Sequence, residues 1–170
     1  DNRISQPVNE NLSAALTDPA LAPFVTVIDP ANSPADLALI RGFIVVQTHR
    51  PTRPEVTREL VEAWYRDRAH IKFPERIELC LGLFPDPEAF RPKGLIVRQT
   101  RQRWGSMSPA GRLLLNRRLV QAPVDAIDYV ITHELCHVAE PHHGAAFFDL
   151  LDKVMPDWER RKQRLERAMA

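Results

Sequence analysis

The segment His133-Glu134-Leu135-Cys136-His137 (HELCH) decides how this sequence is interpreted, because it sets two histidines four residues apart. On an α-helix, residues four apart project from the same side, one turn above the other. The two imidazoles would therefore point together into one space if a helix forms here.

A helix is predicted to begin near Pro123. Proline suits the first turn of a helix, where its missing N–H is no loss, and the carboxylate of Asp125 suits the positive end of the helix dipole. Apolar residues then recur at spacings of three, four, four and three, namely Val124, Ile127, Ile131, Leu135 and Val138. This periodicity predicts one buried stripe, which anchors the helix in the core and leaves the histidines on another side.

The chemistry of the HELCH segment indicates zinc. Two histidines on one helix face can hold a zinc ion, and the carboxylate of Glu134, next to the first histidine, leans over the same region. Zinc lowers the pKa of a bound water molecule, and a nearby carboxylate can take its proton. The sequence therefore predicts a zinc hydrolase of the HExxH type, with His133 and His137 as metal ligands and Glu134 as the catalytic base.

A catalytic zinc site needs a third protein ligand and keeps one position for water. His143 follows His137 by six residues. On a continuing helix its side chain would be turned away by about 240°, so the helix must end first. Pro141 is placed to end it, and we predict that His143 returns from a loop as the third ligand. His142 is the rival for this position, and Glu140 fits a supporting or solvent-exposed role better.

Secondary structure in the rest of the chain follows from residue patterns. Residues 1–34 are rich in Asn, Asp, Ser and Pro and are expected to be partly disordered, apart from a short strand at 24–28. A further strand is expected at 42–47 and an amphipathic helix from 55 to about 70, after which Pro74 interrupts the helical pattern. Helices are also expected at 145–155 and 158–167, on either side of a short turn.

Residues 94–100 and 112–116 alternate as strands do, and a connection rich in Gly and Ser joins them, so a hairpin-like pair is predicted. The segment 91–118 that contains them holds eight positive charges and no acidic residue. These are Arg91, Lys93, Arg98, Arg101, Arg103, Arg112, Arg117 and Arg118. They are either solvated strand faces that pair with carboxylates elsewhere, or a rim that contacts a polyanion.

Composition sets the broad class. A chain of 170 residues with 44% hydrophobic content can bury one core of ordinary size, and its formal net charge of +1 indicates neither a nucleic-acid binder nor an acid-seeking protein. The two cysteines, Cys80 and Cys136, are expected to be free thiols. No apolar run is long enough for a membrane span and no secretory pattern opens the chain, so we expect a cytoplasmic protein without a membrane partner.

Several motifs occur together in a recognisable order. They are Arg101-Gln102-Arg103-Trp104-Gly105-Ser106-Met107-Ser108, Asn116, Ile127-Asp128-Tyr129-Val130 leading into HELCH, His143-Gly144, Phe147-Phe148 and Met155-Pro156-Asp157-Trp158. In this order the chain resembles the YgjP-like metallopeptidase domain, related to the SprT-like proteases, over residues of roughly 60 to 168. The family usually has cysteine where this chain has Met107, so a role for that thiol is absent here.

The resemblance implies an α+β, minimal zincin-like fold: a small twisted sheet packed on an active-site helix, with further helices towards the C-terminus. Its ligands carry over to His133, His137 and His143, and its general base to Glu134. We therefore expect an N-terminal segment, 1–54, partly irregular with short strands, and a zincin-like metallohydrolase domain, 55–170.

The predicted function is a metallopeptidase that hydrolyses peptide bonds by Glu-assisted attack of zinc-bound water on a peptide or protein substrate. In zincin folds the substrate generally lies along a sheet edge, for which residues 94–100 are the candidate. The first alternative is a nucleoside triphosphate pyrophosphatase, which the lack of a P-loop or a carboxylate cluster disfavours. The second is a zinc-stapled, nucleic-acid-associated binding module, which has no use for Glu134.

Other residues near the site are assigned to packing. Trp104 and Tyr129 are expected to pack, and Cys136 to be an inert buried thiol. Arg101 and Arg103 either face the cleft, where they could bind a carbonyl oxygen or a phosphate, or form salt bridges on the strand surface.

Overall fold

The computed structural model describes residues 26–28, 36–40, 43–47 and 54–169. The chain divides between Trp64 and Tyr65 into two compact units. The predicted domain boundary at residue 54 stays a prediction.

A three-stranded sheet belongs to the first unit. It contains β1 (Thr26–Ile28), β2 (Asp36–Ile40) and β3 (Phe43–Gln47) in the order β1-β3-β2. β1 runs parallel to β3, and β2 runs antiparallel to it. The predicted strands at 24–28 and 42–47 are confirmed as β1 and β3, whereas β2 was not predicted because its Leu-Ala-Leu run fits a helix equally well. The partial disorder predicted for residues 1–34 lies, β1 apart, outside the described residues.

Helix α2 (Pro54–Leu81) is continuous and contains Pro74, so the predicted interruption at this proline is wrong. Pro74 lies on the exposed side of the helix, where water can reach the carbonyl that loses its hydrogen bond. Phe73 and Ile77, on the other side, are buried in the core. Burial of two large apolar side chains contributes about 1.5–3 kcal/mol each, which offsets the cost of about 3 kcal/mol for an internal proline.

A second three-stranded sheet contains β4 (Gly94–Arg98), β5 (Gly105–Met107) and β6 (Arg112–Asn116) in the order β4-β6-β5. The predicted hairpin of β4 with β6 is wrong, because these two strands are parallel and β5 is the antiparallel partner of β6. The connection is long enough to cross over the sheet and to contribute β5 on its way. A three-residue strand that starts with glycine gave no alternating pattern in the sequence.

The turn between β5 and β6 depends on Gly111. Its φ of +75° lies in the left-handed region, which favours glycine. Its N–H donates to the carbonyl of Ser108 at 2.8 Å, and its own carbonyl accepts from the N–H of Lys93 at 2.8 Å. The turn is thereby fastened to the residue that precedes β4.

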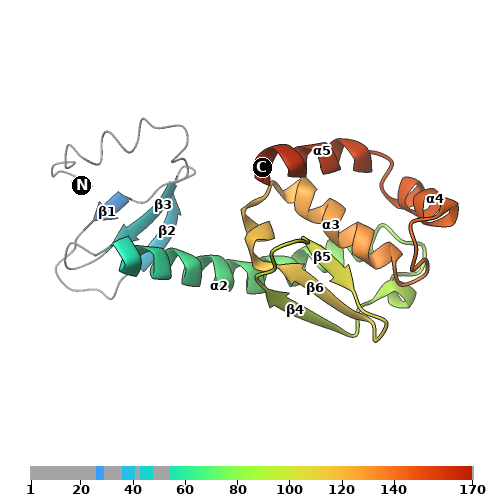
Figure 1. Cartoon of the computed structure of the whole chain (residues 1–170), viewed down its shortest axis with the longest axis horizontal. Helices are drawn as coiled ribbons and strands as arrows, with labels where there is room; N and C mark the ends of the chain where they lie inside the picture. The colour runs from blue at the N-terminus through green and yellow to red at the C-terminus, as the bar shows by residue number, and fades with distance from the viewer. Residues whose placement is uncertain (1–25, 29–35, 41–42, 48–53, 170) are drawn as a thin grey trace, which may run out of the picture. The chain divides into compact units, whose positions relative to one another are not determined.

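Helix α3 (Val124–Cys136) lies between this sheet and the helices α4 (Ala145–Val154) and α5 (Trp158–Met169), as Figure 1 shows. Short 3-10 helices, η2 (Pro87–Phe90) and η3 (Arg117–Gln121), precede β4 and α3. The predicted start of α3 and both C-terminal helices are confirmed. The buried stripe is shorter than predicted, because Val124 and Val138, at and beyond the helix ends, are 43% and 39% exposed.

An ion pair ties α2 to α3. The guanidinium of Arg76 donates from Nε and Nη2 to the two carboxylate oxygens of Asp128, each at 2.7 Å, and both side chains are largely buried. Arg161 of α5 approaches the same carboxylate at 3.7 Å. Asp128 therefore connects three helices within the second unit.

The predicted α+β fold class is confirmed: a small sheet packs on α3, and two further helices follow it. Among the described residues, no helix combines the length and apolar character that crossing a membrane requires.

Candidate metal centre and cleft

The end of α3 gives the histidines their positions. The helix ends at Cys136, before the predicted break at Pro141, and His137 is its capping residue. The N–H groups of Ala139 and Glu140 donate to the carbonyl of Cys136 at 3.1 and 2.9 Å, which closes the last turn. The chain then returns through a loop to Gly144, where α4 begins.

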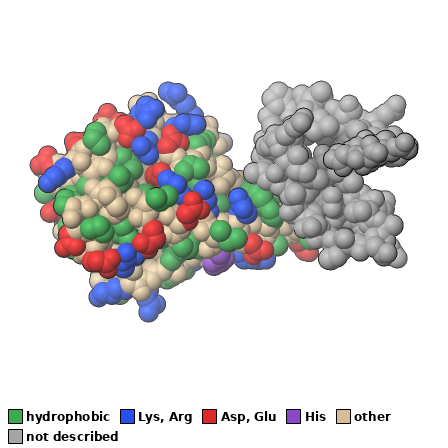
Figure 2. Space-filling model, turned by 180° about the vertical axis from the view of Figure 1, so that it is seen from behind, with side chains coloured by type: hydrophobic (Ala, Val, Ile, Leu, Met, Phe, Trp, Pro, Cys, Tyr) green, Lys and Arg blue, Asp and Glu red, His purple; other side chains and the backbone are tan. Residues whose placement is uncertain are grey.

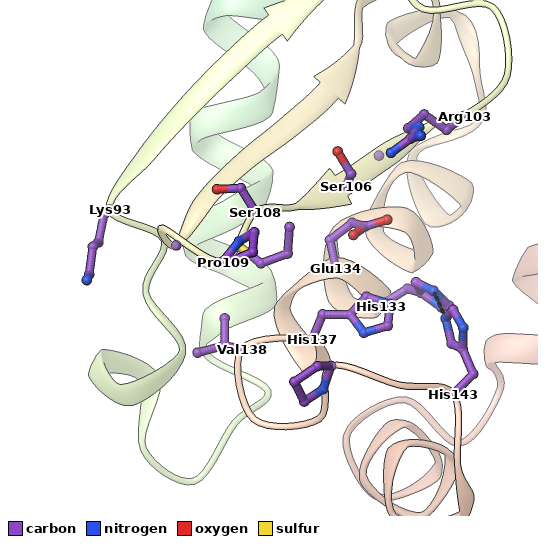
Figure 3. Close-up of a pocket in the computed structure, with 14 residues that line it drawn as sticks. Lys93, Arg103, Ser106, Ser108, Pro109, His133, Glu134, His137, Val138 and His143 are labelled. Atoms are coloured by element: carbon purple, nitrogen blue, oxygen red, sulfur yellow. Dashed lines mark hydrogen bonds between the residues drawn. The ribbon is translucent and has the colours of Figure 1, made fainter.

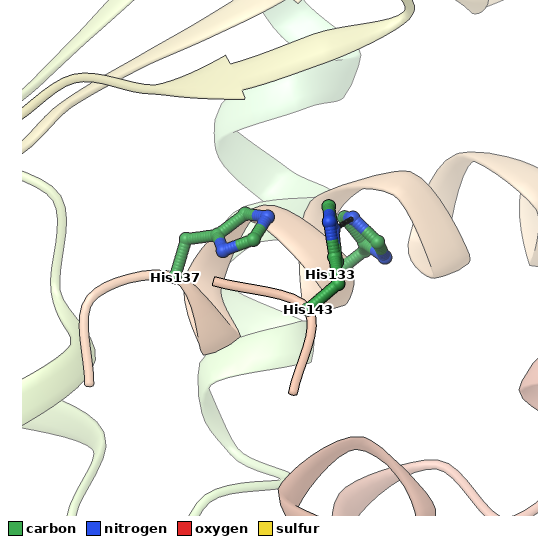
Figure 4. A group of neighbouring side chains, drawn as sticks. All are labelled: His133, His137 and His143. Atoms are coloured by element: carbon green, nitrogen blue, oxygen red, sulfur yellow. Dashed lines mark hydrogen bonds between the residues drawn. The ribbon is translucent and has the colours of Figure 1, made fainter. Parts of the chain in front are cut away.

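Three histidines converge at this loop. One ring nitrogen from each of His133, His137 and His143 lies within 4.8 Å of the other two. The Nε2 atoms of His133 and His143 are 2.9 Å apart, and Figure 4 shows their rings meeting over the end of α3. Among the described residues, this is the one group of three or more His, Cys, Asp or Glu side chains close enough to hold a metal ion.

Neither alternative to His143 as the third ligand has its side chain in this cluster. His142 is exposed and outside the cluster. Glu140 contributes its backbone: its carbonyl oxygen lies 2.9 Å from Nδ1 of His137. A proton on Nδ1 would be donated to this carbonyl, which fixes the ring and leaves Nε2 as the atom that can bind a metal.

The lowered pKa values of these histidines favour binding of a cation. Burial, together with the neighbouring His137 and His143, lowers the pKa of His133 to about 4. Burial and the neighbouring His137 and His142 also lower the pKa of His143. A neutral imidazole is the form that binds metal, and three of them are a usual donor set for a zinc ion that keeps an open position. The residues present therefore fit zinc.

Phe147 of α4 supports all three rings. Its ring centroid lies 4.9 Å from that of His133, 4.7 Å from that of His137 and 4.7 Å from that of His143, and the side chain is fully buried. Sequence reasoning missed this role. Its signals in the sequence were its position one helical turn after His143 and its place in the Phe147-Phe148 motif.

Glu134 lies against strand β5 rather than in open solvent. A Cβ atom added to Gly105 would lie 2.8 Å from Cγ and 3.0 Å from Oε1 of Glu134, so a side chain at this point of the strand would displace Glu134. Burial raises the pKa of Glu134 to about 7, while a backbone hydrogen bond from Met107 and the positive charge of Arg103 act in the opposite direction. The carboxylate is thus held between β5 and the histidines.

A cleft of about 790 Å³ opens in front of these groups. Its walls come from β5, the turn after it and the loop after α3, with Lys93 and Arg103 far apart along the lining, as Figure 3 shows. The prediction that residues 94–100 form the substrate edge is wrong: β4 lies on the opposite edge of the sheet, and β5 lines the cleft.

A family model matches most of the chain. The model describes the YgjP-like metallopeptidase domain and matches residues 23–168. The chain belongs to this family. The match starts well before residue 60, where the resemblance in the sequence begins, so the family domain includes β1 to β3 as well.

Two solved structures are similar in outline. The metallopeptidase zymogen abylysin of Pyrococcus abyssi has 20% identity and a TM-score of 0.47, over 57% of this chain and 91% of that one. The metallopeptidase zymogen jannalysin of Methanocaldococcus jannaschii has 18% identity and a TM-score of 0.49, over 58% and 90%. No curated protein sequence matches the chain.

Membership of a metallopeptidase family makes the chain a hydrolase of this class that uses a divalent metal, and the histidine cluster provides a place for the ion. Family membership also implies a peptide or protein substrate. The identity of the metal and the assignment of individual residues stay predictions.

The positive charges of segment 91–118 have different surroundings. Arg91 forms salt bridges with Glu78 and Glu88 at the surface. Arg103 and Lys93 line the cleft instead. Figure 2, the view from behind, shows positive and negative side chains intermixed on that face of the second unit. Contact with a polyanion stays a prediction.

The residues assigned to packing do pack. Trp104 is half-buried against the core, and Tyr129 is buried and stacks on Trp158 with ring centroids 6.3 Å apart. Burial raises the pKa of both thiols, Cys80 and Cys136, to about 12, so neither ionises near neutral pH.

Proposed function

We propose that the chain is a zinc-dependent metallopeptidase that hydrolyses peptide bonds, with His133, His137 and His143 as the metal ligands and Glu134 as the general base. The observation that supports this most directly is the convergence of three imidazoles beside a carboxylate on one open cleft. Histidine ligands, an adjacent base and access for a substrate are the components that this reaction needs.

Zinc held by the three imidazoles would supply a Lewis acid, which lowers the pKa of water and polarises a carbonyl oxygen. The chain's own residues prepare the site for it. Glu140 fixes the ring of His137 through its carbonyl, and Phe147 packs under all three rings. Such supporting contacts limit ring rotation and so lower the entropy lost on binding the ion.

Glu134 transfers a proton from the attacking water molecule to the leaving group. It takes a proton from the attacking water molecule and then gives it to the nitrogen of the leaving amine. A general base works best when its pKa is near the working pH, and burial brings the pKa of Glu134 to about 7. Gly105 and the Met107 backbone keep the carboxylate in place during both transfers.

Strand β5 offers an edge for an extended substrate. The carbonyl of Trp104 accepts from the N–H of Asn116, and the N–H of Ser108 donates to the carbonyl of Arg112, so this alternate set of residues bonds to β6. In an antiparallel pair the residues between them point their backbone groups the other way. Gly105 and Met107 therefore turn their backbone groups away from β6. The Met107 backbone already bonds to Glu134, which leaves the remaining groups of this edge for a peptide that adds as a further strand.

The two alternative functions have less support. A pyrophosphatase would need carboxylates for magnesium, and among the described residues that line the cleft Glu134 is the only acidic one. A zinc-stapled binding module would use a closed site of four protein ligands, whereas this cluster has three and opens into the cleft.

The test compares Glu134→Gln with Glu159→Gln, the same change at an exposed position on α5. Cleavage of an unfolded protein is followed, and bound zinc is measured by elemental analysis. We expect Glu134→Gln to lose roughly 10²- to 10⁴-fold in rate while it keeps one zinc ion per chain, because the carboxylate moves a proton and is not a ligand. Glu159→Gln should behave as the unchanged protein does.

His143→Ala completes the experiment, since it should lose most of the zinc. Full activity of Glu134→Gln would remove Glu134 from the mechanism. Zinc that stays bound in His143→Ala would remove His143 from the ligand set.

A further inference from the structure

The charged side chains of the catalytic cleft are predominantly positive. Among the described residues that line it, Lys93 and Arg103 are the basic side chains and Glu134 is the one acidic side chain. A divalent ion bound by the histidines would add to this positive excess. A substrate segment that enters the cleft therefore meets a positive potential, which attracts acidic residues and repels basic ones.

The excess has its origin in the acid-free segment 91–118, which supplies β5, the turn after it and both basic side chains of the cleft. Because this segment holds no carboxylate, its basic side chains can pair only with other elements or with a bound molecule. Arg91 has found such partners in Glu78 and Glu88, and none of these three residues lines the cleft.

The two basic side chains of the cleft differ in their surroundings. Lys93 and Arg103 lie at opposite ends of the lining, with Glu134 between them, as Figure 3 shows. Burial raises the pKa of Glu134 and the positive charge of Arg103 acts against this rise, so Arg103 already interacts with the proposed base. In the part of the chain that the structure describes, no carboxylate pairs with Lys93. Lys93 is therefore the cation that is open to a substrate group.

The side chain of Lys93 is exposed, yet the turn below it holds it in place. Its N–H donates to the carbonyl of Gly111 at 2.8 Å. Its methylene stem lies across the same glycine, since a Cβ atom added to Gly111 would lie 3.3 Å from Cγ and Cδ of Lys93. A stem that is already packed loses less entropy when its ammonium group binds a partner.

The course of β5 indicates which part of a substrate passes Lys93. The strand starts at Gly105, beside Glu134, and runs to Met107, and the turn after it leads to Gly111 under Lys93. Antiparallel pairing is slightly more stable per residue than parallel pairing, so we take the substrate to run opposite to β5, with its amino side towards Lys93. At about 3.3 Å per residue, Lys93 then meets a side chain roughly two to four residues before the cleaved bond.

We propose that the cleft selects acidic segments of polypeptide, and that Lys93 binds the carboxylate of a substrate residue on the amino side of the cleaved bond. The inference rests on the proposed peptidase function and adds a substrate class to it. Because Lys93 is exposed, the gain from one ion pair is modest and depends on salt.

The experiment uses the zinc-loaded full chain and a peptide that is cleaved at one bond. Glu, Gln or Lys is placed in turn at each of the four positions before this bond. At low ionic strength, kcat/KM at the responsive position should be about threefold higher with Glu than with Gln, and about tenfold higher with Glu than with Lys. Salt at about 0.5 M should reduce both ratios, since exposed charges are then screened.

Two variants change the charge at Lys93. Lys93→Met keeps a stem over Gly111 and should remove the preference for Glu over Gln. Lys93→Glu reverses the charge and should make the Lys peptide a better substrate than the Glu peptide. The matched control is Lys153→Glu, which changes the net charge equally at an exposed position on α4 outside the cleft and should keep the original order. Thermal denaturation of each variant checks that it is folded.

The outcomes separate the two proposals. A preference for Glu that Lys93→Glu reverses and Lys153→Glu leaves unchanged supports the inference. Equal cleavage of the Glu, Gln and Lys peptides at all four positions overturns it and leaves the peptidase function standing, as does a preference that Lys93→Glu does not change or that Lys153→Glu changes equally. Failure of the folded, zinc-loaded protein to cleave any peptide or unfolded protein overturns both.

Discussion

Gly105 is the residue at which the sheet and the proposed base come closest. A Cβ atom here would also lie 3.1 Å from Cγ1 of Val130, in addition to its overlap with Glu134. Val130 is buried, so the carboxylate would have to give way. Because Gly105 has no Cβ atom, the carboxylate of Glu134 can occupy its position against β5.

Gly105→Ala should lower kcat by roughly 10²-fold while zinc content stays unchanged, because a displacement of about 1 Å at a reacting group has an effect of this size. The control is Gly94→Ala on β4, where an added Cβ meets no atom within 4 Å. Steady-state kinetics and elemental analysis of both variants give the comparison. Wild-type activity in Gly105→Ala would show that the carboxylate is free to move away.

At the residue scale, the sequence predicted the histidines better than their surroundings. The four-residue spacing of His133 and His137 is a local property of a helix, and the position of His143 after a proline indicated a return of the chain. Gly105 acts on Glu134 across the fold, through a contact that no spacing in the chain expresses, and the position of Phe147 one turn after His143 was only a weak signal of its contacts with the rings. Their roles required coordinates.

At the scale of elements, the position of α3 depends on Asp128. Its carboxylate lies between Arg76 of α2 and Arg161 of α5, and its side chain is 12% exposed. Asp125, three residues earlier on the same helix, pairs with Arg164 at 2.8 Å in a more exposed setting. The two aspartates allow a matched comparison of buried and exposed ion pairs.

Asp128→Ala should lower the free energy of unfolding by about 3 kcal/mol, because it leaves the largely buried Arg76 without its partner. Asp125→Ala should cost about 1 kcal/mol or less, as expected for an exposed pair. Urea denaturation of the two variants measures the difference. Equal losses would mean that the Arg76–Asp128 pair adds nothing beyond an ordinary surface contact.

Elements with a long sequence pattern were predicted correctly. The predictions were wrong where tertiary packing determines the structure. α3, α4 and α5 follow from their periodicity. Pro74 looked like a helix end, yet burial of its neighbours outweighs the cost of a proline inside α2. β5 was missed because three residues are too few for a pattern, and with it the true pairing of the sheet.

For the whole molecule, the core and the candidate metal centre are separate. The core joins α2, β6, α3, α4 and α5 through buried apolar side chains, and none of the three clustered histidines belongs to it. Two core side chains join the two: Phe147 touches all three rings, and Tyr129 meets the ring of His133 with centroids 5.8 Å apart. The fold should therefore persist when the metal is removed.

Treatment with a chelator should abolish hydrolysis and leave the far-ultraviolet circular dichroism spectrum unchanged. The melting temperature should fall, because a ligand present at about 100 times its Kd stabilises the folded state by about 2.7 kcal/mol. Readdition of zinc should restore both. Loss of the helical signal on chelation would instead place the metal among the groups that the fold requires.

The family match covers more of the chain than the sequence motifs did. Motifs carried the resemblance only from about residue 60, since the earlier residues offer strands but no chemistry-bearing pattern. The match from residue 23 includes β1 to β3 in the family domain, and parallel pairing of β1 with β3 lies beyond what local patterns predict.

The three histidines fall within eleven consecutive residues, 133 to 143, whereas the contact of Gly105 with Glu134 joins residues 29 apart. The ligand set is thus a feature of low contact order, and it can assemble as soon as one helix and one loop have formed. The position of Glu134 depends on a contact between residues far apart in the sequence, so it is fixed only after the sheet has formed. During folding the ability to bind a metal should therefore arise before the ability to catalyse.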